Sequence, residues 1–198
     1  MARASQVPWN EASAATRAGG ALLICGGIVL GIAFILVALA PIGPASVTPL
    51  VGVTLLLATA LLLAGLPALF TVQAKETGTA GAVAHGLLTI GLLLLVVVSA
   101  TPVLHPDADL LPGDSPVLFL LAVALAAGLI LTAVVTLRAR VLPRAPAIGL
   151  LAGAVCFAFA FFVAELVTPL AGQVGTALAG VLLGASFAWL GRAVWIAS

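Results

Sequence analysis

The sequence predicts an all-α membrane protein, a polytopic bundle of six transmembrane helices. Of its 198 residues, 64% are hydrophobic and 7% are charged, whereas an ordinary soluble domain carries about 25% charged residues. The apolar residues form six long runs, each close to the ~20 residues that a helix needs to cross a hydrocarbon core. These runs lack the strict apolar and polar alternation of barrel strands, so helices are the structures expected to span the bilayer.

The first three runs are separated by turn-forming or charged residues. The first span, Gly20–Ala40, is too long for the apolar part of a signal peptide, which is about 7–15 residues, so we retain it as a membrane span. A proline-rich segment follows it and leads to the second span, Leu50–Phe70. Segment 75–78 carries charge and a glycine, which predicts a turn before the third span, Gly81–Thr101.

The last three apolar runs are also separated by proline-rich, charged or polar segments. The proline-rich segment 102–116 ends the third span and precedes the fourth, Val117–Leu137. An arginine- and proline-rich segment separates this span from the fifth, Ala147–Val167. A short polar segment, 168–173, then leads to the sixth span, Val174–Val194. The layout suits three helical hairpins, although an inverted arrangement of two three-helix halves stays open.

All seven basic residues fall on one side of the predicted membrane. They are Arg3, Arg17, Lys75, Arg138, Arg140, Arg144 and Arg192. The loops predicted on the other side contain no Lys or Arg, and Asp107, Asp109 and Asp114 lie in the longest of them. By the positive-inside rule, both termini are expected in the cytoplasm.

The tryptophans indicate the same orientation and complete the domain assignment. Trp9, Trp189 and Trp195 fall at the predicted cytoplasmic boundary, where an indole buries its ring and keeps its N–H hydrated. We therefore expect a cytoplasmic N-terminal segment over residues 1–19 and one transmembrane domain over 20–195, located in the cytoplasmic membrane.

Composition also excludes several functional classes. The net charge of +1 and the lack of a basic stripe argue against a nucleic-acid partner. Cys25 and Cys156 lie in apolar runs without CxxC spacing, which indicates packing residues. The acidic outer loop lacks the ligand spacing of an EF-hand, and no nucleotide, hydrolase or zinc-protease motif occurs. We therefore expect no catalytic residue, no metal site and no enzymatic activity.

Two ionisable residues within the predicted spans are the candidate sites. A charge at the bilayer centre costs about 2.5–3.5 kcal/mol on insertion scales, so an ionisable group there suggests function. His85 lies among small residues near the cytoplasmic boundary, and Glu165 lies near the outer end of the fifth span. His85 is either a neutral side chain bonded to a neighbouring helix or interfacial water, or the axial ligand of a cofactor. Glu165 is either a carboxylate at headgroup level or a substrate contact.

Small residues recur at four-residue spacing in the sixth predicted span, and Gly180 and Gly184 are central to this ridge. Such ridges allow helix backbones to approach closely in a membrane. The ridge is expected either to pack inside the bundle or to contact a membrane-protein partner or a second copy of the chain. The other partner expected is the lipid bilayer.

Three sequence segments carry a resemblance to known proteins. They are 65–73 (GLPALFTVQ), 136–144 (TLRARVLPR) and 188–195 (AWLGRAVW). Through them the chain resembles a group of uncharacterised small six-span membrane proteins of actinobacteria and Chloroflexi, over most of its length. Its hairpin layout also resembles the acid-resistance membrane proteins of the HdeD type, on architecture alone.

Three functional hypotheses follow. The first is a non-enzymatic integral membrane protein, acting as a structural or accessory subunit of a cytoplasmic-membrane assembly. The second is a small-solute transporter or substrate-binding component, with Glu165 and four threonines lining its cavity: Thr54, Thr59, Thr89 and Thr132. The third is a tetrapyrrole- or quinone-binding membrane protein that uses His85. Apart from bound lipid, no cofactor is expected under the first hypothesis.

Overall fold

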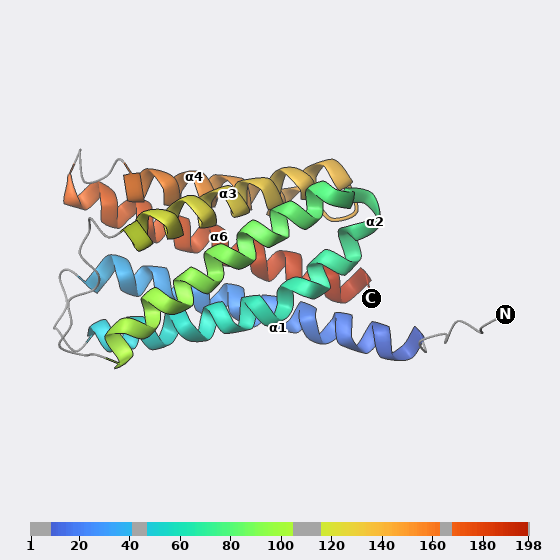
Figure 1. The fold of residues 1–198 in the computed structure, drawn as a ribbon, viewed down its shortest axis with the longest axis horizontal. Helices are drawn as coiled ribbons and strands as arrows, with labels where there is room; N and C mark the ends of the chain where they lie inside the picture. The colour runs from blue at the N-terminus through green and yellow to red at the C-terminus, as the bar shows by residue number, and fades with distance from the viewer. Residues whose placement is uncertain (1–8, 41–46, 105–115, 163–167, 198) are drawn as a thin grey trace.

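The described part of the chain is helical throughout. The computed structural model describes residues 9–40, 47–104, 116–162 and 168–197, and no strand occurs within those ranges. The helices are α1 (Trp9–Leu39), α2 (Val47–Leu104), α3 (Pro116–Ala139), α4 (Arg144–Phe162) and α6 (Pro169–Ala197) (Figure 1). All five are long and apolar enough to cross a membrane.

Helix α2 reverses direction at Gly78. Its 58 residues would extend about 87 Å as a straight helix, far beyond a bilayer core. Gly78 has φ 53° and ψ −136°, a conformation that glycine adopts without a Cβ clash. Figure 1 shows the chain turning back at this point. We call residues 47–77 the first arm and residues 79–104 the second arm.

The two arms of α2 lie side by side and antiparallel. Near the end away from Gly78, a Cβ built on Gly52 would lie 2.8 Å from the Ser99 carbonyl oxygen. Near the Gly78 end, the Phe70 and His85 rings are 5.1 Å apart. The two spans expected on either side of segment 75–78 therefore form one interrupted helix, so the structure has five described helices where six were expected.

Several helix boundaries differ from those of the predicted spans. Helix α1 begins at Trp9, inside the expected N-terminal segment, because a helix continues past the length that the hydrocarbon core requires. Helix α6 includes most of the expected separator 168–173. Thr168 caps it, since its hydroxyl accepts a hydrogen bond from the Ala171 N–H at 3.2 Å. Helix α4 begins at Arg144, before the expected Ala147, and residues 163–167 at the end of the fifth predicted span lie outside the described residues.

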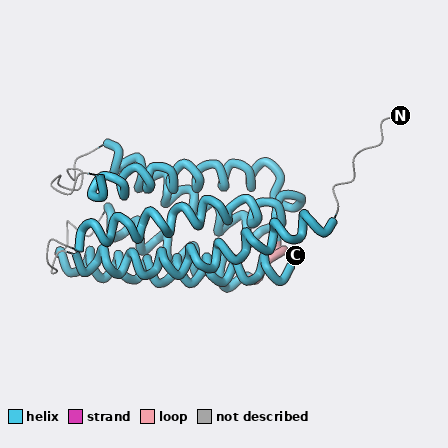
Figure 2. Tube along the Cα trace, turned by 90° about the horizontal axis from the view of Figure 1, so that it is seen from below, coloured by secondary structure: helices cyan, strands magenta, loops and turns pink. Residues whose placement is uncertain are grey.

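The helices pack in an order that brings the first and last together. Helix α1 packs against α2 and α6, α3 lies between α2 and α4, and α4 packs against α6. The start of α1 and the end of α6 lie at the same end of the bundle (Figure 2). Large apolar side chains fill its interior. They include Leu30 and Phe34 of α1, Leu88 and Leu92 of α2, Leu125 and Leu129 of α3, and Leu183 and Phe187 of α6.

Glycines bring α1 and α6 into backbone contact. A Cβ on Gly27 would lie 2.6 Å from the Gly184 carbonyl oxygen, and a Cβ on Gly184 equally close to the Gly27 carbonyl oxygen. A second contact one heptad away pairs Gly20 with Gly191. Gly180 faces Phe34. Gly180 and Gly184 of the α6 ridge therefore pack against α1 inside the chain.

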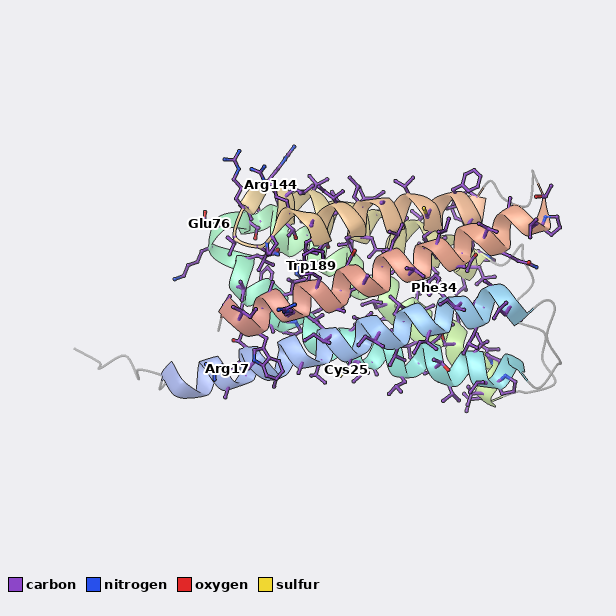
Figure 3. The ribbon with its side chains drawn as sticks, turned by 180° about the vertical axis from the view of Figure 1, so that it is seen from behind. Arg17, Cys25, Phe34, Glu76, Arg144 and Trp189 are labelled. Carbon is purple, nitrogen blue, oxygen red and sulfur yellow. The ribbon has the colours of Figure 1, made fainter. Side chains whose placement is uncertain are left out.

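The described charged side chains gather at one end of the bundle. They are Arg17, Lys75, Glu76, Arg138, Arg140, Arg144 and Arg192. Arg17, Glu76 and Arg144 lie at the same end in Figure 3. Arg140, with φ 56°, forms part of the turn between α3 and α4 at this end. Many large apolar side chains along the helices are exposed, which fits a bundle surrounded by lipid.

The α1–α6 contact gives a stability prediction. We expect Gly184→Ala to be less stable than Gly86→Ala by about 1–3 kcal/mol, because the new methyl would overlap the Gly27 backbone. A Cβ on Gly86 meets nothing within 4 Å, so this control carries the same gain in helix propensity without the overlap. The measurement is the free energy of unfolding in mixed micelles as the denaturing detergent increases. Equal stability of the two variants would contradict the contact.

Candidate functional site

His85 lies in the second arm of α2, about 10 Å along the helix from the Gly78 turn. Its ring is packed against Phe70 of the first arm, at a centroid distance of 5.1 Å and an interplanar angle of 60°. The side chain is only 8% exposed. The first arm therefore supplies the aromatic neighbour of His85.

The hydrogen bonding of His85 defines the tautomer. Nδ1 lies 2.9 Å from the Gly81 carbonyl oxygen. Because a carbonyl only accepts, Nδ1 carries the hydrogen and donates it. In the neutral imidazole, Nε2 then has a lone pair and no hydrogen. Nε2 is buried and has no hydrogen-bond partner among the described residues.

A cavity of about 290 Å³ adjoins this histidine. Both arms of α2 line it, through Leu63, Leu66, Pro67, Phe70, His85, Gly86 and Thr89. Pro67 and Gly86 are exposed on the bundle surface, so the cavity opens where lipid would surround the protein. Its wall is apolar except for the imidazole, the Thr89 hydroxyl and the backbone.

This arrangement provides a single nitrogen ligand. A histidine that ligates a metal commonly donates its other N–H to a carbonyl, as Nδ1 of His85 does to Gly81. However, no group of three His, Cys, Asp or Glu side chains suited to a metal ion occurs in the described part of the chain. The cavity volume is near the lower end of ligand pockets, about 300–1,000 Å³.

A second buried polar contact joins α2 to α3. Gln73 Nε2 donates to Thr136 Oγ1 at 3.1 Å, and the Thr136 hydroxyl donates to Gln73 Oε1 at 3.4 Å. Both side chains are almost completely buried. This contact joins residues 63 positions apart and was not predicted. The feature of the sequence that could have indicated this contact is Gln73 itself, a glutamine that continues the apolar face of the second span.

Thr132 lies one turn before Thr136 on α3. Its side chain is fully buried, and its hydroxyl has no hydrogen-bond partner within the described ranges. An unsatisfied buried hydroxyl lowers stability. Thr132 therefore adds a polar atom to the interior near the Gln73–Thr136 contact.

A cavity of about 200 Å³ lies toward the end opposite the charged residues. It is lined by Phe34, Val37, Leu55, Leu95, Phe157, Ala160, Phe161 and Thr176. The Phe34 and Phe157 rings meet edge to face, with centroids 6.1 Å apart. Phe34 lies toward this end in Figure 3. The surroundings are suited to an apolar group.

The threonines expected to line a solute cavity have different surroundings in the structure. The hydroxyls of Thr54 and Thr59 donate to carbonyls of their own helix, at 2.6 and 2.7 Å. Thr89 lines the His85 cavity. Glu165 lies outside the described residues, so its role stays a prediction.

Comparison of the chain with protein-family models, curated proteins and solved structures found no match. The architecture and the sites themselves are therefore the basis of the functional argument. The described residues form a helical protein with five helices long and apolar enough to cross a membrane, a histidine cavity on its surface and an apolar cavity at one end.

The Gln73–Thr136 contact gives a second prediction. We expect Thr136→Val to destabilise the protein by about 1 kcal/mol, because the Gln73 amide loses its partner in the interior. In a double-mutant cycle with Gln73→Leu, the coupling energy should be about 0.5–1.7 kcal/mol. Unfolding in mixed micelles provides the measurement.

Thr54→Val is the matched control, because that hydroxyl bonds only to its own helix in the structure. It should show no coupling to Gln73→Leu. A coupling energy near zero for Thr136→Val would argue against the buried interhelical contact.

Proposed function

We propose that this protein is a six-span component of the bacterial cytoplasmic membrane with both termini in the cytoplasm. Its role is non-catalytic, as a structural or accessory subunit of a membrane assembly. The observation that carries the proposal is the separation of the described residues into a charged end and an interior filled by leucine, alanine and phenylalanine.

The geometry of α2 supports the proposal of six crossings. Each arm exceeds the ~20 residues that span a hydrocarbon core, and the arms run antiparallel from the turn at Gly78. Together with α1, α3, α4 and α6, the arms give an even number of crossings. Lys75 and Glu76 next to the turn support its placement at the membrane surface, and the positive-inside rule supports the cytoplasmic side.

The interior supports a non-catalytic role. The buried polar side chains of the described chain are mainly Thr, Ser and Gln, several of which bond to their own helix or to each other. Among the buried polar side chains of the described residues, His85 is the titratable one, and the Gln73 amide is neither an acid nor a base. Such an interior favours packing and binding.

Exposed apolar faces support association with another membrane protein or a second copy. On α1, Ile28, Ile32, Ile35 and Leu39 are exposed, and their spacing places them on one face of the helix. Lipid or a partner helix would cover this face. Since Gly180 and Gly184 pack against α1, the proposed partner would contact exposed faces such as this one.

The orientation is tested by cysteine labelling in intact bacterial cells. In a background with Cys25 and Cys156 replaced by alanine, we expect Asp109→Cys to react with a membrane-impermeant maleimide. Glu76→Cys should react only after the cells are permeabilised, because six crossings place residues 76 and 109 on opposite sides. Labelling of both in intact cells would exclude a second arm that crosses the membrane, and the reverse pattern would invert the orientation.

The accessory role is tested by isolation in a mild detergent followed by native mass spectrometry. We expect a complex larger than the 19.6 kDa chain, containing a second copy or another membrane protein. The positive control is a known membrane complex from the same extract, which must survive the procedure. A lone, fully stable monomer under those conditions would refute the accessory role.

The transport alternative has a narrower basis. It rests on the apolar cavity near Phe34 and Phe157, which is suited to an apolar solute. Its predicted acidic contact, Glu165, lies outside the described residues. Transport stays a prediction.

A further inference from the structure

We propose that the cavity between the two arms of α2 binds the head group of a membrane-soluble quinol, with His85 Nε2 accepting a hydrogen bond from a quinol hydroxyl. Here a quinol means an aromatic ring that carries two hydroxyls and an apolar tail. The proposal goes beyond the accessory role and does not depend on it, because a lone monomer could bind the same ligand.

The first step is the unpartnered nitrogen. His85 is 8% exposed, and its Nε2 has no hydrogen-bond partner in the part of the chain that the structure describes. The Nδ1–H···O=C contact with Gly81 leaves Nε2 as an acceptor. A buried acceptor without a donor is unfavourable, so a ligand hydroxyl next to it would bind favourably.

The second step is a backbone acceptor in the same wall. Proline has no N–H, so Pro67 cannot donate the helical hydrogen bond to the Leu63 carbonyl. Both Leu63 and Pro67 line the cavity. The site thus combines the His85 imidazole, the Thr89 hydroxyl, which both donates and accepts, and Leu63, whose carbonyl lacks its usual helical donor. This balance favours a ligand with more than one hydroxyl.

The third step is the shape of the cavity. Its volume of about 290 Å³ suits one substituted ring. The Phe70 ring provides an aromatic wall, and Gly86 leaves space that a larger side chain would fill. These features favour a ring over the aliphatic hydroxyl of a lipid such as diacylglycerol, which shares the same donor chemistry.

The fourth step is depth. The lining residues lie about 10–22 Å along the arms from the Gly78 turn. The cavity therefore lies below one membrane surface and within the apolar region of α2. A head group there would be reached laterally from the bilayer, and its apolar tail would remain in lipid beside the exposed Pro67 and Gly86.

The chemistry predicts selectivity for the reduced ligand. A quinone has carbonyl oxygens in place of the two hydroxyls and cannot donate to Nε2. One hydrogen bond of about 0.5–1.5 kcal/mol corresponds to a preference of up to about tenfold, and two acceptors would increase it. Binding alone is proposed, with no electron transfer.

The experiment uses the full chain in phosphatidylcholine nanodiscs. Three ligands are titrated: decylubiquinol under anaerobic conditions, decylubiquinone and dioleoylglycerol. Binding is measured by equilibrium partition against empty nanodiscs. We expect saturable binding of decylubiquinol, binding of decylubiquinone that is about tenfold weaker, and no saturable binding of dioleoylglycerol.

Two variants and one control locate the site. His85→Phe retains an aromatic ring without an acceptor and should lose the preference for quinol over quinone. His85→Gln supplies an amide oxygen and should restore part of it. Val97→Ala, an exposed position on the same arm, should bind as the unmodified chain does. Thermal unfolding of each variant confirms that it is folded.

A spectroscopic measurement covers the case in which His85→Phe does not fold. With ¹⁵N-histidine, the Nε2 resonance of His85 should move on addition of decylubiquinol, and much less with decylubiquinone. His105→Gln, in the outer loop of the sequence, assigns the two histidine signals.

Several results would overturn the proposal. They are equal affinity for quinol and quinone, an unchanged preference in folded His85→Phe, an unmoved Nε2 resonance at saturation, or saturable binding of dioleoylglycerol alone. The last result would assign the cavity to a hydroxylated lipid. None of these results bears on whether the protein associates with a partner subunit.

Discussion

Backbone contact between α1 and α6 is the constraint on which the bundle depends. Within lipid, the hydrophobic effect does not drive helices together, so close packing has to supply the attraction. Gly27 and Gly184 leave no room for a Cβ between the two helices, and Gly20 and Gly191 repeat the contact toward the charged end. This contact joins the first and last helices, so the intervening helices are held within a closed arrangement and their leucines face a common interior.

The closed arrangement explains the distribution of polar groups. An interior of leucine and phenylalanine cannot solvate a hydroxyl, so Thr59 and Ser99 donate to carbonyls of their own helix. The Gln73 amide has both a donor and an acceptor group, which one carbonyl of its own helix cannot satisfy, and it pairs with Thr136 on α3. His85 satisfies Nδ1 locally but leaves Nε2 without a partner. It is this remaining acceptor that distinguishes the His85 cavity from the other, mainly apolar spaces of the bundle.

Run length and charge predicted the helical class and the clustering of described charges, because both depend on local composition. Run length and charge predicted the positions of the helix ends less accurately. Trp9 and Pro169 lie outside the predicted spans yet inside helices, since hydropathy records the hydrocarbon region and not the full hydrogen-bonded helix. Gly78 was correctly placed in a turn, but the continuation of helix on both sides requires backbone geometry.

The candidate site was predictable only in part. His85 stood out because an ionisable side chain is rare in an apolar run. Its neighbour Phe70 and the opening at Pro67 belong to another predicted span, so their proximity depends on how the arms align. The Gln73–Thr136 pair required the register between α2 and α3, which composition does not contain.

The reversal at Gly78 also makes the His85 cavity local in sequence. Its lining residues all lie between Leu63 and Thr89, within two consecutive arms of one helix. Contacts between nearby segments form with little loss of chain entropy. The cavity therefore belongs to a helical hairpin built from consecutive residues, and α3, α4 and α6 follow that hairpin in the chain. If the hairpin forms before these later helices are translated, the ligand proposed for its cavity would be present while they assemble, and would act as a folding partner as well as an occupant.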